Sequence, residues 1–303
     1  MTAIASSPVA VPKRKRATSF DPNPARAGWI TKIVLTVLCA LWLMPVIGTF
    51  ITSFRPLDDV SSSGWWTLIV HPSRWGHLTL HNYDQAVNGR VSMGNALINS
   101  LAITLPSVFI PILIAAFAAY AFTFIEFKGR ETLFLIIVSL LVVPNYVAFV
   151  PISSFFARHH WNGTFFSAWL AHVGFGMSLA IYIIRNYMAT LPKAVIESAK
   201  IDGATHFQTF FRLVLPMSTP VLAAFAIFQF LWVWNDFLVA LIFIGPGKKE
   251  PLTVAITHLK GQLGQGWELI TAGGFFAMLL PLIVFLGLQR YFVRGLSAGA
   301  VKG

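Results

Sequence analysis

The sequence contains few charged residues and almost no cysteine. Of its 303 residues only 11% are Asp, Glu, Lys or Arg, and 56% are hydrophobic, whereas soluble globular proteins carry about 25% charged residues. Cys39 is the single cysteine, so an internal disulfide is excluded. Acidic residues are the scarcer charged class, 11 against 22 basic ones. This composition excludes an ordinary soluble domain and predicts an integral membrane protein.

The chain also lacks motifs of common active sites. The run that begins at Gly247 continues with two lysines but has neither the upstream glycine nor the hydroxyl residue of a phosphate-binding loop. No His-Glu-x-x-His zinc motif occurs, and His159 and His160 are adjacent instead of being spaced along one helix face. We therefore expect no catalytic residue, no metal site and no ATP hydrolysis by this chain.

Six hydrophobic runs are each long enough to cross a bilayer, whose hydrocarbon core of about 30 Å requires roughly 20 helical residues. The runs are Trp29–Phe54, Asn95–Phe124, Glu131–Phe156, Phe165–Ala189, Met217–Ile244 and Thr271–Phe292. Prolines such as Pro144 and Pro281 predict kinks, which neighbouring helices can compensate. The predicted fold class is an all-α membrane protein with six transmembrane helices.

Basic residues are distributed unevenly over the connections between these runs. If the N-terminus is cytoplasmic, 15 of the 22 Lys and Arg residues fall on the cytoplasmic side. Because positive charge marks that side, both termini and the loop 190–216 are predicted to be cytoplasmic. This topology accounts for the net charge of +11 without a nucleic-acid partner.

The most informative segment is the polar loop 190–216 between the fourth and fifth runs. Pro192 suits the first turn of a helix. Gly203 predicts a break, because glycine accepts backbone angles that other residues avoid. Thr205 and Gln208 have the spacing of a capping box. The loop is therefore predicted to form two short helices joined by a turn.

This loop resembles the signature of permease subunits of bacterial ABC importers, Glu-Ala-Ala-x-x-x-Gly followed by Leu-Pro, and is called the signature loop below. The matching residues, which the resemblance implies contact an ATPase, are Glu197, Ser198, Ala199, Asp202, Gly203, Ala204, Leu215 and Pro216. Ser198 stands where the family usually has Ala, an exchange that keeps a small side chain. The resemblance covers about residues 30–303 and implies an ABC-importer permease core in a bacterial inner membrane.

Two further stretches resemble the carbohydrate-uptake branch of this family, in particular its smaller maltose-type permease. The fifth run carries Trp234, Asn235 and Asp236, whose polar atoms and flat ring suit a sugar. A carboxylate near membrane depth requires a polar cavity or a partner, so a substrate path and a structural tie between helices both stay open. For the C-terminal tail, the resemblance implies contact with the ATPase through Gly295, Gly299 and Lys302.

The loop after the fifth run, residues 245–270, is polar and rich in glycine. A plain flexible connection is the simple interpretation. In sugar-importing relatives the matching loop enters the binding protein. The resemblance therefore implies that the binding protein is contacted by Gly261, Gln262, Gly264 and Trp267.

The expected organisation has five parts. Residues 1–28 form a disordered basic tail and residues 29–54 the first transmembrane helix. Residues 55–94 form an external segment, whose tryptophans at 65, 66 and 75 favour the membrane–water interface. A five-helix permease core, 95–292, precedes a cytoplasmic tail, 293–303.

Taken together, the resemblance implies one permease subunit of an ATP-driven, binding-protein-dependent importer of a mono-, di- or oligosaccharide. The implied partners are a second permease, two subunits that bind ATP and magnesium, an extracytoplasmic sugar-binding protein and membrane lipid, with no cofactor on this chain. An importer of a polyol or glycerophosphate is one alternative. The other is an ion-driven secondary carrier, for which Asp236 and His172 are the candidate intramembrane groups.

Overall fold

The computed structural model describes residues 28–260 and 266–297, with side chains up to Gln289. The described residues form helices joined by short connections, and no β-strand occurs among them. They belong to two compact units, residues 1–47 and 48–303. The predicted all-α class is confirmed.

The first unit contains most of helix α1, Trp29–Ser53. This helix is apolar along its length and is long enough to cross a membrane. Its bounds agree within one residue with the first hydrophobic run predicted from the sequence.

The second unit begins with a folded segment that precedes the long helices. Its elements are α2 (Leu57–Ser62), α3 (Thr67–Val70), the 3₁₀-helix η2 (Pro72–His77) and α4 (His81–Asn88). Arg55 is buried beneath them, where its guanidinium donates to the carbonyl oxygens of Asp59 and Ser63 at 2.6 and 2.9 Å. Burial lowers the pKa of this guanidinium, an effect that the Asp59 charge opposes and the Arg74 charge reinforces.

Three long apolar helices of the second unit are α5 (Met93–Phe124), α8 (Phe165–Met188) and α14 (Trp267–Ser297). With α1 they make four helices that could each span a membrane among the residues the structure describes. Two bent pairs raise the number to six if each pair forms one span: residues 130–142 with 145–158 at 98°, and 206–217 with 219–235 at 69°.

The first bend follows from a proline. Helix α6 (Arg130–Ser139) and the 3₁₀ turn η3 (Leu140–Val142) end before α7 (Asn145–Arg158) begins. Val143 and Pro144 are extended at ψ 120° and 119°, because proline disfavours the helical conformation of the preceding residue and has no N–H to donate. Pro144 therefore breaks the third predicted run rather than merely kinking it.

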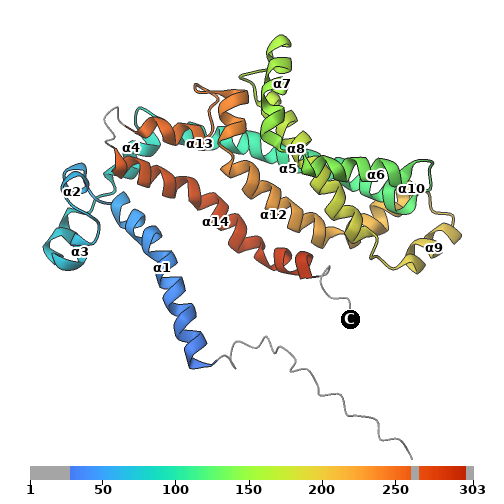
Figure 1. Ribbon diagram of the computed structural model, residues 1–303, viewed down its shortest axis with the longest axis horizontal. Coiled ribbons are helices and arrows are strands. Elements are labelled where there is room, and N and C mark those ends of the chain that lie inside the picture. The colour runs from blue at the N-terminus through green and yellow to red at the C-terminus, as the bar shows by residue number, and fades with distance from the viewer. Residues whose placement is uncertain (1–27, 261–265, 298–303) are drawn as a thin grey trace, which may run out of the picture. The chain divides into compact units, whose positions relative to one another are not determined.

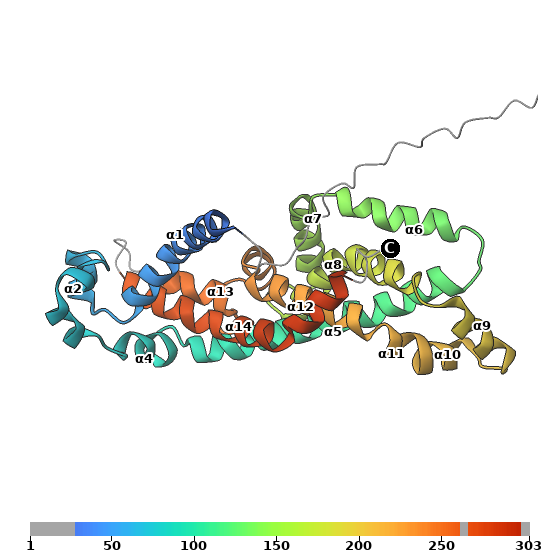
Figure 2. The same ribbon diagram turned by 90° about the horizontal axis from the view of Figure 1, so that it is seen from below.

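The second unit is held together along α5. Helix α8 packs along α5, and α12 (Thr219–Asn235) packs on both α5 and α14 (Figure 1). The remaining elements are α9 (Lys193–Ile201), α10 (His206–Thr209), η4 (Phe210–Val214), α11 (Leu215–Met217), η5 (Ala240–Ile244), α13 (Leu252–Ala255) and η6 (Ile256–Leu259). Both ribbon views place α9 and α10 at the end of this unit opposite to α2 and α3 (Figures 1 and 2).

Candidate functional site

The first helix of the signature loop ends in a hydrogen-bonded turn around Gly203. Pro192 is the N-cap of α9 and Asp202 its C-cap. Gly203 has φ +79°, and its N–H donates to the Lys200 carbonyl at 3.1 Å. The N–H of Ala204 donates to the Ala199 carbonyl at 2.9 Å. This pair of bonds is a Schellman motif, in which glycine occupies the left-handed position, so the predicted break is confirmed.

The second helix begins with the predicted capping box. The Gln208 N–H donates to Thr205 Oγ1 at 3.3 Å, and the Thr205 N–H donates to Gln208 Oε1 at 2.9 Å. Helix α10 continues into a π-helical turn, η4, and into α11, which contains Pro216. The chain then bends at Ser218 into α12. Pro216 thus marks the boundary with the next span to within two residues.

Apolar side chains attach the signature loop to the long helices. Ile196, Phe210 and Val214 are buried in one cluster with residues of the second half of α5 and of α8. The ring of Phe210 stacks on Phe117 of α5 with 4.6 Å between centroids. Because burying a side chain of this size contributes roughly 1.5–3 kcal/mol, the two short helices are firmly packed against these spans.

The opposite surface of the signature loop is exposed. Of the residues that matched the signature, Ala199 is buried, Ala204 and Leu215 are half-buried, and the exposed ones are Glu197, Ser198, Asp202, Gly203 and Pro216. The most exposed large apolar side chains of the loop are Ile201, at 85% exposure, and Phe207, at 68%. Exposed apolar side chains on a polar loop are suited to contact with a partner. Sequence reasoning missed both, although their position off the buried helix face was the available signal.

The residues predicted to line a substrate path lie at the C-terminal end of α12. Trp234 is buried, donates from Nε1 to the Ala277 carbonyl at 3.1 Å and stacks on Phe230. Asn235 donates to the Leu231 carbonyl at 2.7 Å. Asp236 Oδ1 accepts from the Val239 N–H at 2.7 Å, and thus caps the helical turn that follows α12.

A cavity of about 490 Å³, here called the span cavity, lies at the break between η3 and α7. Its polar lining comes from Asn145, Ser178 of α8 and Gln229 of α12, and Trp232 adds an aromatic face. Trp234, Asn235 and Asp236 are not among its lining residues. Sequence reasoning missed Gln229, although an amide in an otherwise apolar run was a usable signal.

Gln229 is fully buried, and only one end of its side-chain amide is hydrogen-bonded. Its Nε2 donates to the Ser107 carbonyl at 3.2 Å, while Oε1 has no hydrogen-bond partner among the described residues. A Cβ at position 176 would lie 2.8 Å from this Nε2, so Gly176 provides the space that the amide occupies. A buried polar atom without a partner costs about 1–3 kcal/mol, and a polar solute in the span cavity could offset that cost.

His172 of α8, named above as a candidate intramembrane group, is 1% exposed. Its ring packs edge-on against Trp232 with 5.7 Å between centroids. The structure gives it no hydrogen bond to another described side chain, and Nδ1 is buried without a partner. Within the described part of the chain, His172 is therefore a buried ring that packs on Trp232 and forms no hydrogen bond to another helix.

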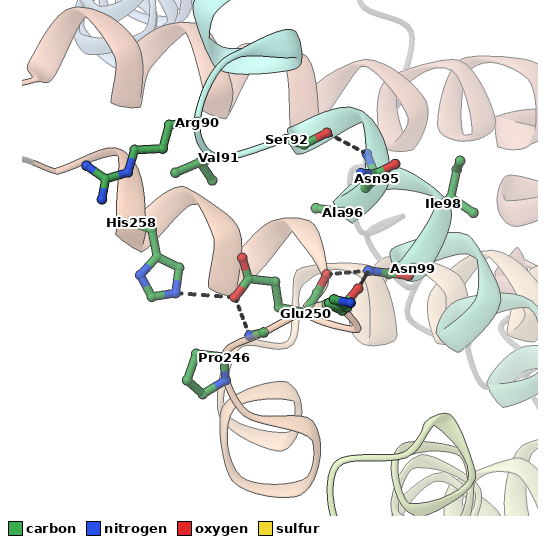
Figure 3. A pocket seen from close by; sticks show the side chains of 12 residues that line it. Arg90, Val91, Ser92, Asn95, Ala96, Ile98, Asn99, Pro246, Glu250 and His258 are labelled. Carbon is green, nitrogen blue, oxygen red and sulfur yellow. Dashed lines mark hydrogen bonds and ion pairs between the residues drawn. The ribbon is translucent and has the colours of Figure 1, made fainter.

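A second polar pocket, of about 820 Å³, lies between the start of α5 and the loop that follows η5 (Figure 3). Asn99 Nδ2 donates to the carbonyls of Lys248 and Glu250, both at 3.0 Å. Glu250 Oε2 accepts from the Gly247 N–H at 3.0 Å and lies 3.3 Å from His258 Nε2. These bonds hold residues 247–258 against α5.

Several residues predicted to contact the binding protein or the ATPase lie near the ends of the described ranges or outside them. Gly261, Gln262 and Gly264 lie outside the described residues, whereas Trp267 is the first residue of α14 and is 55% exposed. Helix α14 runs on to Ser297 and includes Gly295, which the sequence had placed in a tail. Gly299 and Lys302 are outside the described residues.

Curated relatives resemble nearly the whole chain. The osmoprotective compounds uptake permease protein GgtD of Synechocystis is 47% identical, over 89% of this chain and 91% of its own length. The alpha-glucoside transport system permease protein AglG of Rhizobium meliloti is 48% identical, over 93% of this chain and 100% of its own length. The melibiose/raffinose/stachyose import permease protein MelC of Bacillus subtilis is 31% identical over 90% of this chain and 96% of its own.

A solved structure shares the fold. It is a chain of a bacterial ABC transporter involved in the import of the acidic polysaccharide alginate, with a TM-score of 0.72 and 18% identity over 87% of this chain and 95% of the other. The family described as the inner membrane component of binding-protein-dependent transport systems matches residues 111–298, which include the signature loop. The chain belongs to this family of binding-protein-dependent permeases.

Proposed function

We propose that this chain is a transmembrane permease subunit of an ATP-driven, binding-protein-dependent importer of a carbohydrate. Relatives named for alpha-glucoside and for melibiose, raffinose and stachyose import support this substrate class. The signature loop supports the role of the subunit, because its exposed surface is suited to a partner and its other surface is packed into the span helices.

The observation that carries the proposal is the burial of Phe210 between the signature loop and α5. An ATPase that moves α9 and α10 would contact Glu197 through Ala204, together with Leu215 and Pro216. Since packed cores transmit displacement instead of absorbing it, the movement would pass through Phe210 to α5 and α8. In this way ATP-driven closure would alternate access to the solute path.

The proposed topology has six spans, in which residues 130–158 together form the third span, α12 and the turn after it form the fifth, and both termini lie in the cytoplasm of a bacterial inner membrane. The distribution of Lys and Arg supports it. The separation of α9 and α10 from α2 and α3, at opposite ends of the second unit, is consistent with a cytoplasmic signature loop and an external segment 55–94 (Figure 2).

The proposed assembly contains this permease, a second permease, two ATP-binding subunits and an extracytoplasmic sugar-binding protein, all in contact with membrane lipid. ATP and Mg²⁺ would be held by the ATP-binding subunits. A related complex was solved with a periplasmic protein that carries an alginate pentasaccharide. On this chain, the pocket beside Glu250 and the exposed Trp267 would face such a protein, together with Gly261, Gln262 and Gly264. Gly295, Gly299 and Lys302 would extend toward the ATPase.

The solute would be a mono-, di- or oligosaccharide, and two groups of residues are available to it. One is the predicted set Trp234, Asn235 and Asp236, which stays a prediction. The other is the span cavity, whose amide, hydroxyl and aromatic surfaces are the mixture that sugar rings bind. A polyol or another small polar solute is the second candidate, because one relative is named for uptake of osmoprotective compounds.

The proposal is tested by mild affinity purification of the chain from its native membrane, with mass spectrometry of the retained proteins. We expect a second permease, an ATP-binding subunit and a binding protein, and the solute on that binding protein identifies the cargo. Uptake should stop when ATP is depleted and persist when the proton gradient alone is collapsed. Repeated recovery of the chain alone, with uptake that follows the proton gradient, would assign it to the secondary carriers.

A further inference from the structure

A third cavity, of about 320 Å³, lies where α5 and α8 end against helix α9 of the signature loop. Four of its lining residues are basic: Arg130, Arg185, Lys193 and Lys200. It is called the cation pocket here for these cationic side chains and not for the ligand that it could hold. Glu197 is the single acidic residue that lines it. Its volume falls in the range of small-molecule sites.

The positive charge of the cation pocket is only partly neutralised within the described chain. Arg130 forms an ion pair with Glu131 at 3.0 Å. The guanidinium of Arg185 lies over the Phe134 ring at 4.7 Å, and its one hydrogen bond, to Asn186 Oδ1, is long at 3.4 Å. The Arg185 Nε is buried without a partner. Lys193 and Lys200 form no ion pair with any carboxylate in the described residues.

The rest of the lining is apolar, and the position is at the end of two spans. Phe122 and Phe124 come from the last turn of α5, and Leu191 and Ile196 flank the start of α9. A ligand that fits both the basic and the apolar parts of this lining carries a negatively charged group next to an apolar group. Basic pockets between membrane helices near the bilayer surface have the chemistry that binds phospholipid headgroups, and guanidinium groups bind phosphate oxygens in pairs.

We propose that the cation pocket binds the phosphate group of an anionic phospholipid. The phosphate lies among Arg185, Lys193 and Lys200, and the acyl part follows Phe122 and Phe124 toward the bilayer. Because Lys193, Glu197 and Lys200 all belong to α9, the lipid touches the element that we assign to ATPase contact. An anion here attracts the two lysines and repels Glu197, so it favours the orientation of α9 in which Glu197 faces outward. This inference does not depend on the identity of the transported solute.

The test counts lipids bound to the complete purified complex, reconstituted in nanodiscs of phosphatidylcholine with a minor fraction of phosphatidylglycerol, by native mass spectrometry. We expect Arg185→Gln to lower the apparent affinity for phosphatidylglycerol about fivefold and the double variant Arg185→Gln, Lys200→Gln about thirtyfold, since each basic residue near the surface contributes about 1 kcal/mol. Glu197→Gln should raise the affinity. Arg185→Lys, which keeps the charge but loses the fork of donors and the contact with the Phe134 ring, should be intermediate between Arg185→Gln and the unaltered chain.

Lys128→Gln is the matched control, because Lys128 is exposed, lies close to Arg130 in the chain and does not line the cation pocket. Equal lipid retention in Lys128→Gln and Arg185→Gln would overturn the proposal. Displacement of phosphatidylglycerol by millimolar inorganic phosphate would assign the pocket to a free anion and overturn the lipid source. Lipid retained by the permease pair but absent from the complex with its ATPase would show that the ATPase occupies the pocket instead.

Discussion

The hydroxyl of Tyr120 lies 3.0 Å from Nδ1 of His206, which joins the membrane helix α5 to the first residue of α10. The Tyr120 ring also meets Phe210 edge to face, with 5.3 Å between centroids. One side chain therefore contacts both the polar start and the apolar anchor of the second half of the signature loop. Any displacement of α10 must carry α5 with it or break this hydrogen bond.

We expect Tyr120→Phe to lower uptake about fivefold while ATP hydrolysis by the complex continues. The lost hydrogen bond is worth about 1 kcal/mol, which corresponds to a factor of about five. Uptake and hydrolysis would be measured together in proteoliposomes. Tyr182→Phe in α8 makes the same chemical change at an exposed position without a described hydrogen bond, and should have no effect. Equal losses in both variants would contradict the assigned link.

Substitutions of Gly203 should separate backbone strain from charge. A Cβ at this position meets no atom within 4 Å, so the φ of +79° is the constraint within the chain. Gly203→Ala should cost about 1–2 kcal/mol, and Gly203→Asn less, because asparagine tolerates the left-handed region. Gly203→Asp has the same shape as Asn and should retain the least ATPase on co-purification, because it adds a negative charge to the exposed surface. Normal uptake and ATPase retention with Asp would reject the coupling role.

Phe207 is expected to contribute to partner binding rather than to the stability of this chain. Its side chain is 68% exposed, so Phe207→Ser should leave the melting temperature of the isolated chain within about 2 °C, because surface changes are usually within about 0.5 kcal/mol. The same variant should weaken retention of the ATPase about tenfold, as expected for an aromatic anchor worth about 1–2 kcal/mol at an interface. Phe207→Leu should restore most of the retention. A loss of thermal stability without loss of the ATPase would contradict this.

Gln229→Leu distinguishes the span cavity from the predicted path at Asn235. The change removes the unpartnered Oε1 but also the donor to the buried Ser107 carbonyl. Because each unpaired group costs about 1–3 kcal/mol, the two effects oppose each other and the net change in stability should be small. Loss of a hydrogen bond to the solute should raise the apparent KM for uptake about fivefold or more, with the same ATPase rate. Asn235→Ala is the companion variant, because its amide bonds to the Leu231 carbonyl. An unchanged KM for Gln229→Leu and a raised KM for Asn235→Ala would favour the path predicted from the sequence.

Arg55 should hold the segment 55–94 in its folded form. Its guanidinium donates to two carbonyls and to Ser63 Oγ at 2.7 Å. Arg55→Met should make this segment cleavable by protease at concentrations about tenfold lower, since it leaves buried carbonyls unpaired at about 1–3 kcal/mol each. Arg55→Lys keeps the charge but not the fork of donors and should be intermediate. Equal protease resistance of all three chains would contradict the role.

The parts of the site that could be predicted from the sequence are those held by local interactions. The bonds between Thr205 and Gln208 and the bond from Ala204 to Ala199 span three and five residues. Their geometry is therefore encoded in adjacent side chains and in one glycine. The long apolar helices were predictable for the same reason, because length and composition alone define them.

The parts of the site that could not be predicted from the sequence depend on contacts between residues that are distant in the chain. Trp234 donates to a carbonyl 43 residues away, and the Gln229 amide bonds to a carbonyl 122 residues away while occupying space left by Gly176. No periodicity predicts which buried polar groups meet across helices. The angle of the bend at Pro144 could not be predicted from the sequence either. Proline predicts that the helix breaks, but the angle between the two halves depends on how they pack.

The π-helical turn η4 has a consequence for insertions and deletions. This wide turn lies directly between α10 and α11, and it holds Phe210 at its first position. Its i→i+5 bonds place one residue more in the turn than the i→i+4 bonds of an α-helix. Removal of one residue from 210–214 would therefore let the turn close into an ordinary α turn, with Phe210 and Phe207 near their present directions. Removal of one residue from the α-helical segments on either side would instead rotate Phe207 by about 100° relative to the fifth span, so homologous chains should tolerate a deletion within this turn better than one beside it.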